Sequence, residues 1–178
     1  MQGSTVSNSY AIYSSAMMGG KIANNTIITS GINAYGIYLT GSINSNITNN
    51  TITTLGSYGY CIYLYGSNNS NIANNNITTS NQDGRGVYLS ASSTNTLSNN
   101  TLITSGISGY GAILSLSSNS NNLTDNIITT TNTSAYGIYL SSSSNNSITN
   151  GSIIATQSAA YYLKSADTTN NFKATNFT

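Results

Sequence analysis

The sequence of 178 residues contains no proline, histidine or tryptophan, a single cysteine, and only four basic and three acidic side chains. The lone Cys61 excludes a disulfide within the chain. Four basic side chains are too few to neutralise a run of phosphates, which argues against nucleic-acid binding. No apolar run approaches the roughly 18 residues of a membrane-spanning helix. Hydrophobic residues nevertheless make up 38% of the chain, which is enough to build a core.

The composition also bears on location. The first four residues, MQGS, have neither the basic start nor the apolar stretch of a secretory signal, so we expect a mature product, a fragment, or export by another route. The polar, uncharged, tyrosine-rich composition predicts an extracellular or cell-surface protein. Asn-x-Ser/Thr sequons such as those at Asn24, Asn46 and Asn99 agree with that location, although a chain rich in Asn, Ser and Thr also produces sequons by chance.

One motif repeats along the chain with a period of about 25 residues. It is clearest in Gly36–Tyr60, GIYLTGSINSNITNNTITTLGSYGY, and its copies begin near residues 11, 36, 61, 86, 111, 137 and 160. A fixed period of this length is the signature of a repeat architecture. The repeat covers residues 1–178 as a single domain, and we number the positions of each coil from its first residue.

Aligned coils form columns of like residues. Position 2 holds Ile37, Ile62 and Val87, position 4 holds leucines such as Leu39, and position 3 between them is mostly tyrosine. Apolar residues at i and i+2 predict a strand with one buried face, so the tyrosines must point outward. Two further apolar columns occupy positions 12 and 17, and keeping them aligned requires one-residue insertions near 117–122 and 168–171.

An Asn-Asn pair separates positions 12 and 17. Asparagine tolerates left-handed backbone and bonds to nearby main chain, so the pair predicts a sharp turn. Stacked asparagines can also bond from coil to coil, as in cross-β ladders. The predicted turn ladder consists of Asn24, Asn49, Asn74, Asn99 and Asn150. By contrast, residue 92 is expected in a variable loop.

Short strands, tight turns and a 25-residue period leave no room for helices, and each strand must pair with its equivalent in the next coil. The sequence therefore predicts an all-β parallel β-solenoid of about seven coils. The GIYL…NN.I..N.I pattern resembles the repeat of parallel β-helix proteins, among them NosD-type periplasmic proteins, pectin-lyase-like proteins and many microbial surface proteins. This resemblance implies a right-handed β-helix, and it leaves function open because the fold serves enzymes, adhesins and rods alike.

Catalysis and metal binding are not expected. The resemblance implies that polysaccharide-cleaving relatives use clustered acids with Lys or Arg on one sheet, but Asp83, Asp125 and Asp167 fall at unrelated coil positions. Asp83 and Arg85 share one turn and are interpreted as a solvated loop pair. The copper role associated with NosD needs soft or imidazole ligands, which a chain without histidine does not supply. We therefore predict no enzyme activity, no metal and no cofactor.

The outward columns are the candidate binding surfaces. An aromatic ladder can stack on sugar rings or mate with another surface, and it can equally serve only to stabilise the sheet. A threonine column at position 19, including Thr29, Thr54 and Thr104, suggests ice binding as a further alternative. The candidate surface ladder consists of Tyr13, Tyr38, Tyr63, Tyr88 and Tyr139.

The two ends carry no helix, proline or charged cap apart from charges in the last coil, although solenoids normally protect their terminal coils. Met1 falls at position 16 and Thr178 at position 18, so one copy could continue the next with a small overlap. The leading hypothesis is a structural protein that stacks head to tail into a filament, with Val6, Phe172 and Phe177 as candidate assembly residues. The alternative is a surface adhesin or carbohydrate-binding module, in which glycans are the partner, or a fragment of a longer surface protein.

Overall fold

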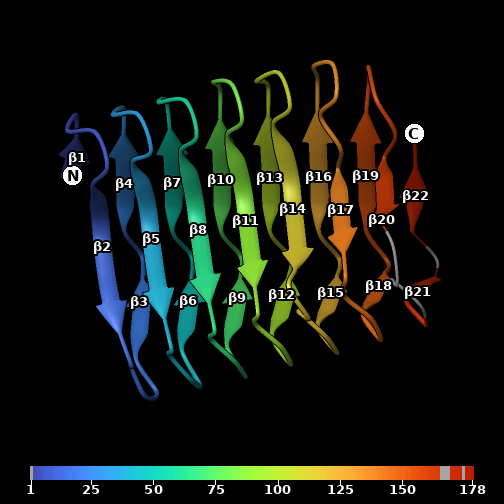
Figure 1. Ribbon diagram of the computed structural model, residues 1–178, viewed down its shortest axis with the longest axis horizontal. Helices are drawn as coiled ribbons and strands as arrows, with labels where there is room; N and C mark the ends of the chain where they lie inside the picture. The colour runs from blue at the N-terminus through green and yellow to red at the C-terminus, as the bar shows by residue number, and fades with distance from the viewer. Residues whose placement is uncertain (1, 165–168, 174) are drawn as a thin grey trace.

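The computed structural model describes residues 2–164, 169–173 and 175–178. This part of the chain consists of short strands and tight turns without a helix, and so it contains no helix that could cross a membrane. Each coil contributes one strand to each of three parallel sheets, and equivalent strands of successive coils lie side by side along the rod (Figure 1). The predicted all-β solenoid of about seven coils is confirmed.

The strands of the eight-stranded sheet have at most four residues each, and they follow one another along the rod in chain order. Its strands are β1 (Gln2–Ser4), β4 (Thr26–Thr29), β7 (Thr51–Thr54), β10 (Asn76–Thr79), β13 (Thr101–Thr104), β16 (Ile127–Thr130), β19 (Ser152–Ala155) and β22 (Asn176–Phe177).

The Tyr sheet carries the tyrosine columns and has seven strands. They are β2 (Tyr10–Ser15), β5 (Tyr35–Thr40), β8 (Tyr60–Tyr65), β11 (Arg85–Ser90), β14 (Tyr110–Ser115), β17 (Ile138–Ser141) and β20 (Tyr161–Lys164).

The short-strand sheet also has seven strands, each of three residues. They are β3 (Lys21–Ala23), β6 (Asn46–Thr48), β9 (Asn71–Ala73), β12 (Thr96–Ser98), β15 (Asn122–Thr124), β18 (Ser147–Thr149) and β21 (Asn171–Lys173).

Register follows the predicted columns. Ile37 pairs with Ile62, and Ile62 pairs with Val87, so like residues stack along the axis. The register step lengthens to 26 residues where Thr96 pairs with Asn122, which confirms the insertion predicted in that coil. In an in-register parallel sheet, equivalent residues of neighbouring strands point to the same side. The same alternation of inward and outward residues therefore continues through every coil.

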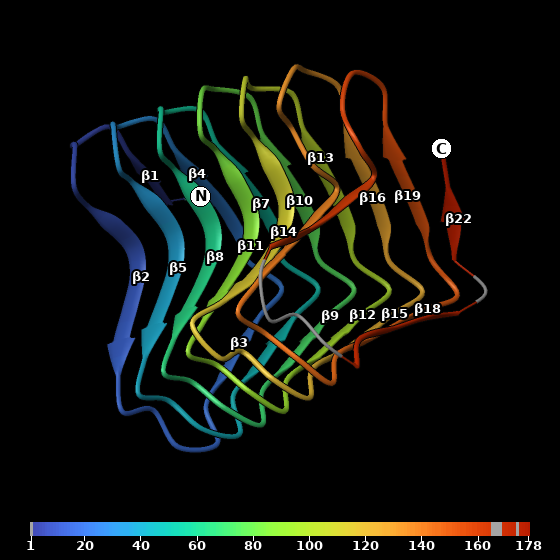
Figure 2. The ribbon, with the colours of Figure 1, turned by 45° about the vertical axis from the view of Figure 1, so that its right-hand side comes forward.

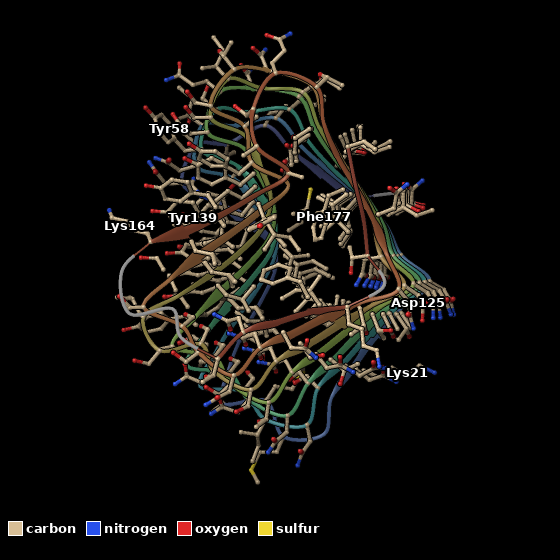
Figure 3. The ribbon with its side chains drawn as sticks, turned by 90° about the vertical axis from the view of Figure 1, so that its right-hand side faces the viewer. Lys21, Tyr58, Asp125, Tyr139, Lys164 and Phe177 are labelled. Carbon is tan, nitrogen blue, oxygen red and sulfur yellow. The ribbon has the colours of Figure 1, made fainter. Side chains whose placement is uncertain are left out.

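The core is the bore enclosed by the three sheets (Figures 2 and 3). In the middle coils its aliphatic side chains are inaccessible to solvent, as at Ile52, Leu64 and Val87. A fully buried side chain of this kind stabilises a fold by about 1.5–3 kcal/mol. A single coil has no partner for its inner face, so this stabilisation exists only when coils stack.

The corner between the short-strand sheet and the eight-stranded sheet uses left-handed backbone. The first residue of each Asn pair has a positive φ, for example 57° at both Asn49 and Asn74. Asn is one of the few residues other than Gly that adopt this conformation routinely. Its side chain is exposed at this position, so the corner depends on its backbone. The same conformation occurs at Asn24, Asn99, Asp125 and Asn150.

Candidate functional site

An asparagine ladder runs inside this corner, and it is formed by the second residue of each pair. The main-chain N–H and the side-chain Nδ2 of Asn50 both donate to Oδ1 of Asn75, each at 3.0 Å. Asn50 Nδ2 also donates to the carbonyl of Ile22 in the preceding coil, at 3.0 Å. The ladder therefore lies one residue later than the predicted set, in the buried side chains of Asn50, Asn75, Asn100 and Asn126, with Asn25 half-buried at its start.

Two further polar ladders, which the sequence predictions do not include, run along the interior. Position 10 carries a second asparagine ladder, in which Asn95 Nδ2 donates to Oδ1 of Asn121 at 3.1 Å. Position 7 carries a serine ladder, in which the N–H of Ser67 donates to Oγ of Ser92 at 2.9 Å. Ser92 lies in the loop between β11 and β12, as expected, but its side chain is fully buried and takes part in the serine ladder. The serine ladder could have been predicted from the sequence, because serine recurs with the coil period at Ser42, Ser67, Ser92, Ser118 and Ser143.

The threonine column at position 19 is also internal. Thr54 and Thr104 are at most 1% exposed, and Thr104 Oγ1 donates to the carbonyl of Gly109 at 3.1 Å. Thr130 makes the equivalent bond to Ala135 at 2.8 Å. A buried column has no contact with water, so the ice-binding interpretation of these threonines is wrong. Thr29, Thr104 and Thr130 instead donate to carbonyls at the corner that precedes the Tyr sheet.

The outer face of the Tyr sheet carries the predicted surface ladder (Figure 3, in which Tyr139 lies outside the bore). The rings of Tyr38 and Tyr63 stack at 4.8 Å between centroids, and those of Tyr63 and Tyr88 stack at 4.9 Å. Tyr13 begins the column and is 54% exposed, and the rings of Tyr38, Tyr63 and Tyr88 that follow are half-buried. Tyr139 continues it in the C-terminal half and stacks on Tyr162 at 5.4 Å.

A second tyrosine column, at the last position of each coil, stands beside the first. Tyr35 and Tyr60 stack at 4.5 Å with their planes 7° apart. Tyr35 meets Tyr38 of the first column edge-on at 6.0 Å. Stacked and edge-on contacts are the favoured aromatic geometries. We call the two columns together the Tyr wall, which comprises Tyr10, Tyr13, Tyr35, Tyr38, Tyr60, Tyr63, Tyr88, Tyr110, Tyr136, Tyr139 and Tyr162.

Arg85 interrupts the second column where a tyrosine is expected. Its Cζ lies 4.9 Å from the ring centroid of Tyr60 and 5.5 Å from that of Tyr110, so the guanidinium is held between two rings. Its Nη1 donates to the hydroxyl of Tyr60 at 3.1 Å and to the main-chain carbonyl of Asp83 at 2.9 Å. Arg85 is thus half-buried in the Tyr wall, and the predicted solvated loop pair with Asp83 is wrong.

Burial raises the pKa of three phenols in the N-terminal half of the Tyr wall. Burial, with neighbouring tyrosines as a smaller cause, raises the pKa of Tyr35 to about 12. Burial likewise raises the pKa of Tyr63 to about 12, against an opposing hydrogen bond from Ser90. The pKa of Tyr60 is also raised by burial, with Arg85 acting in the opposite direction. Phenols with raised pKa values do not ionise near neutral pH, so Tyr35, Tyr60 and Tyr63 present neutral hydroxyls.

Among the other reactive side chains of the described residues, Asp83 and Asp125 lie in different coils and Cys61 lies in β8. Asp83 and Asp125 each occupy a left-handed turn, with φ of 54° and 55°, and Asp167 lies outside the described residues. Cys61 is fully buried, and its thiol lies 3.3 Å from the carbonyl of Thr78. Burial raises the pKa of this thiol to about 12. Within the described ranges, no three potential metal ligands of the His, Cys, Asp and Glu types come together.

The two ends of the bore differ. At the C-terminal end Tyr161, Phe172 and Phe177 form an aromatic cluster, with the ring centroids of Tyr161 and Phe172 at 4.8 Å. Phe177 points into the bore (Figure 3) and lies on Ile153 in register. At the N-terminal end Val6 is 66% exposed on a corner between β1 and β2, where its carbonyl faces Gly31. Of the three candidate assembly residues, only the two phenylalanines extend core columns.

These features define a parallel β-helix with inner polar ladders and an outer aromatic face. The chain matches the family model described as a right-handed β-helix region over residues 1–153, and it belongs to that family. It matches no curated protein sequence.

Two solved structures resemble the chain weakly. One is QnrB1, a plasmid-mediated fluoroquinolone resistance protein, with 11% identity over 87% of this chain and 91% of that chain and a TM-score of 0.26. The other is HetL, a pentapeptide repeat protein involved in heterocyst differentiation regulation from the cyanobacterium Nostoc sp. strain PCC 7120, with 12% identity over 94% and 87% and a TM-score of 0.18. Similarity at this level carries no functional argument.

Proposed function

We propose that this protein is a structural β-solenoid of the cell surface or extracellular space, and that its copies stack end to end into a filament. The observation that carries the proposal is the half-open bore at the C-terminal end. Tyr161 and Leu163 are 42% and 43% exposed, whereas Ile138 and Leu140, their register partners one coil earlier, are fully buried. Apolar surface in this position becomes buried when another coil is added.

The strand edges support the same proposal. β20, β21 and β22 end their three sheets at one end of the rod, and β1, β2 and β3 end them at the other (Figure 1). Each edge strand has one row of main-chain groups without a strand partner, which can template a further strand. The net charge of about +1 gives little repulsion between copies. A head-to-tail contact of this kind does not close on itself, so it propagates.

The junction has one geometric conflict. The Tyr sheet and the short-strand sheet each have seven strands, whereas the third sheet has eight. Stacking β2 of a second copy on β20 of the first, and β3 on β21, brings the second copy's β1 to the rung that β22 of the first copy already occupies. One of the two strands must leave.

The register favours β22 as the strand that stays. Phe177 pairs with Ile153, whereas Gln2, at the same coil position in β1, pairs with Ile27. Phe177 would therefore continue the apolar column onto Ile27 of the next copy, which Gln2 does not. A filament built in this way rises by seven rungs per subunit, about 34 Å at a strand spacing of about 4.8 Å.

Cysteine pairs test this junction directly. In the proposed filament, Asn176 of one copy lies one rung from Thr26 of the next. Strand neighbours at about 4.8 Å between Cα atoms are within the range that a disulfide spans. The Asn176→Cys/Thr26→Cys variant should therefore form disulfide-linked ladders on oxidation. By contrast, Ile154→Cys/Gly3→Cys links copies only if β1 takes the place of β22 and packs on β19.

Electron microscopy and light scattering of the unmodified chain provide the independent readout. The proposal expects unbranched rods much longer than one subunit. A protein that stays monomeric at high concentration, with neither cysteine pair forming linked species, rejects the filament.

The Tyr wall supports carbohydrate binding as a second candidate function. Its rings are stacked at about one strand spacing and are partly open to solvent, as at Tyr13 and Tyr38, and such rings can stack on sugars. Tyr38→Ala combined with Tyr63→Ala should abolish retention on a glycan array while circular dichroism stays unchanged. If the parent protein is not retained on a broad array of glycans, this candidate is rejected.

A further inference from the structure

Three tyrosine pairs in the N-terminal half of the Tyr wall have nearly parallel rings in consecutive coils. The centroid separations are 4.5 Å for Tyr35 and Tyr60, 4.8 Å for Tyr38 and Tyr63, and 4.9 Å for Tyr63 and Tyr88. The angles between the ring planes are 7°, 8° and 17°. Strand register holds the two residues of each pair on neighbouring rungs, so the two phenol rings are kept in stacked contact.

We propose that the Tyr wall is a site of oxidative cross-linking, in which dityrosine bonds join consecutive coils of one chain. The co-reactant is a one-electron oxidant, such as a peroxidase supplied with hydrogen peroxide. Each phenol loses one electron and one proton to become a phenoxyl radical. The two radicals form one bond between their ortho ring carbons, and each ring regains aromaticity as its ortho proton moves to oxygen. The sum is two tyrosines plus H₂O₂ giving one dityrosine and two waters.

Pre-alignment is the reason for assigning the reaction to these pairs. A radical on an isolated surface tyrosine must meet a second molecule, whereas a radical on Tyr60 already has Tyr35 beside it. Holding two reactants in contact replaces a bimolecular encounter by an intramolecular step and raises their effective concentration greatly. Tyr58 provides the contrast, because it is 44% exposed on a loop and has no stacked ring among the described residues.

The two columns of the wall are interrupted in the adjacent strands β11 and β14, and this gives the proposal a sharp internal test. Arg85 replaces a tyrosine between Tyr60 and Tyr110, and Ile113 replaces one between Tyr88 and Tyr139. Ring pairs resume beyond the gap, with Tyr110 and Tyr139 at 5.3 Å and 2° between planes, and Tyr136 and Tyr162 at 4.9 Å. Cross-links should therefore fall into two blocks, and none should join Tyr88 to Tyr139.

The experiment oxidises dilute monomer, isolated by gel filtration, with peroxidase and limiting hydrogen peroxide, and maps linked peptides by mass spectrometry. We expect intramolecular products that have lost two hydrogens per bond, linking Tyr35 to Tyr60, Tyr38 to Tyr63 and Tyr63 to Tyr88. Tyr60→Phe keeps the ring but should remove the first link alone. Tyr58→Phe is the matched control and should leave the map unchanged.

A gain-of-link variant tests the gap. Arg85→Tyr restores a phenol at a position that lies between the rings of Tyr60 and Tyr110. It should create new links from residue 85 to both rings, with the circular dichroism spectrum of the parent retained. The denaturant midpoint of oxidised parent should rise, because each bond closes a 25-residue loop.

Two results would overturn the proposal. One is that dilute parent protein gives no intramolecular dityrosine under conditions that couple free tyrosine. The other is a map in which Tyr58 is linked within the chain as often as Tyr60, or in which Tyr88 is linked to Tyr139. Neither result depends on whether copies stack, so the cross-linking proposal and the filament proposal are tested independently.

Discussion

The side-chain amide of Asn75 and its own main-chain N–H both donate to Oδ1 of Asn100, one coil further along, at 3.0 Å each. Oδ1 of Asn75 accepts the equivalent two hydrogen bonds, which come from the N–H and Nδ2 of Asn50 in the preceding coil. Each buried asparagine Oδ1 thus satisfies two donors of the preceding coil, while the residue's own amide and N–H donate to the following coil. Because any axial shift would leave several buried polar groups unpaired, the ladder fixes the register of the coils.

Replacing Asn75 by leucine should lower the free energy of unfolding by about 2–4 kcal/mol, because the buried donors of Asn50 lose their acceptor. The matched control is Asn74→Gly in the same turn, whose side chain is exposed and whose φ of 57° suits glycine. That change should stay within about 0.5 kcal/mol. Urea unfolding followed by circular dichroism measures both. Equal losses would mean that the ladder bonds contribute little.

Ser92→Ala should lower the free energy of unfolding by about 1–3 kcal/mol, since it leaves the N–H of Ser67 unpaired in the interior. Ser80→Ala, at an exposed position on a corner, is the control and should be neutral. The same unfolding assay applies. A neutral Ser92→Ala would assign the serine column to packing alone.

Stability should fall as the pH rises from about 10 to about 12. Tyr35 and Tyr63 keep their protons in the folded state up to a pKa of about 12, against an ordinary value of 10.0. Above pH 10 the unfolded chain therefore loses protons that the folded chain retains, which favours unfolding. Urea unfolding at pH 9, 10 and 11 measures the effect. Tyr35→Phe/Tyr63→Phe should flatten this dependence, and an unchanged slope in that variant would contradict the assignment.

The thiol of Cys61 should resist modification in the native protein. It is fully buried, and burial raises its pKa to about 12, so the reactive thiolate is scarce at neutral pH. A colorimetric thiol reagent should react at once in guanidinium chloride and only at the rate of unfolding in buffer. Immediate reaction of the folded protein would show that the core opens locally near β8.

Phe177→Asp should stop end-to-end growth and leave the middle coils folded. The charge would lie at the open end of the bore on Ile153, where a second copy would have to bury it without a partner. Light scattering measures growth, and thermal unfolding by circular dichroism checks the fold. Thr178→Asp, one residue further and exposed, is the control. Filaments of normal length from Phe177→Asp would argue against the proposed junction.

Residue spacing alone predicted the coils, the inward columns and the outward tyrosines. The reason is that a parallel solenoid repeats one coil, so a column such as Ile37, Ile62 and Val87 is visible as a 25-residue period before any contact is known. The irregular coil near residue 117 could also be located, because only an insertion keeps Leu97 and Leu123 in one column.

The inner or outer place of the polar columns was decided by the tertiary structure. Asn74 and Asn75 are the same residue type, yet one is exposed in a left-handed turn and the other is buried in a ladder, because consecutive residues at a corner point in different directions. The burial of the threonines at position 19 and of Ser92 was missed for the same reason, since composition does not reveal which polar side chain faces a buried carbonyl.

The sequence by itself determined the fold, because periodic apolar residues can be buried in only one way when like strands stack. Only the tertiary structure decided how Arg85 is used, since its neighbours Tyr60 and Tyr110 come from other coils and are brought to it by strand register. The junction conflict between β1 and β22 likewise emerged only from the strand order, because the rung that a terminal strand occupies depends on where the helical path places it.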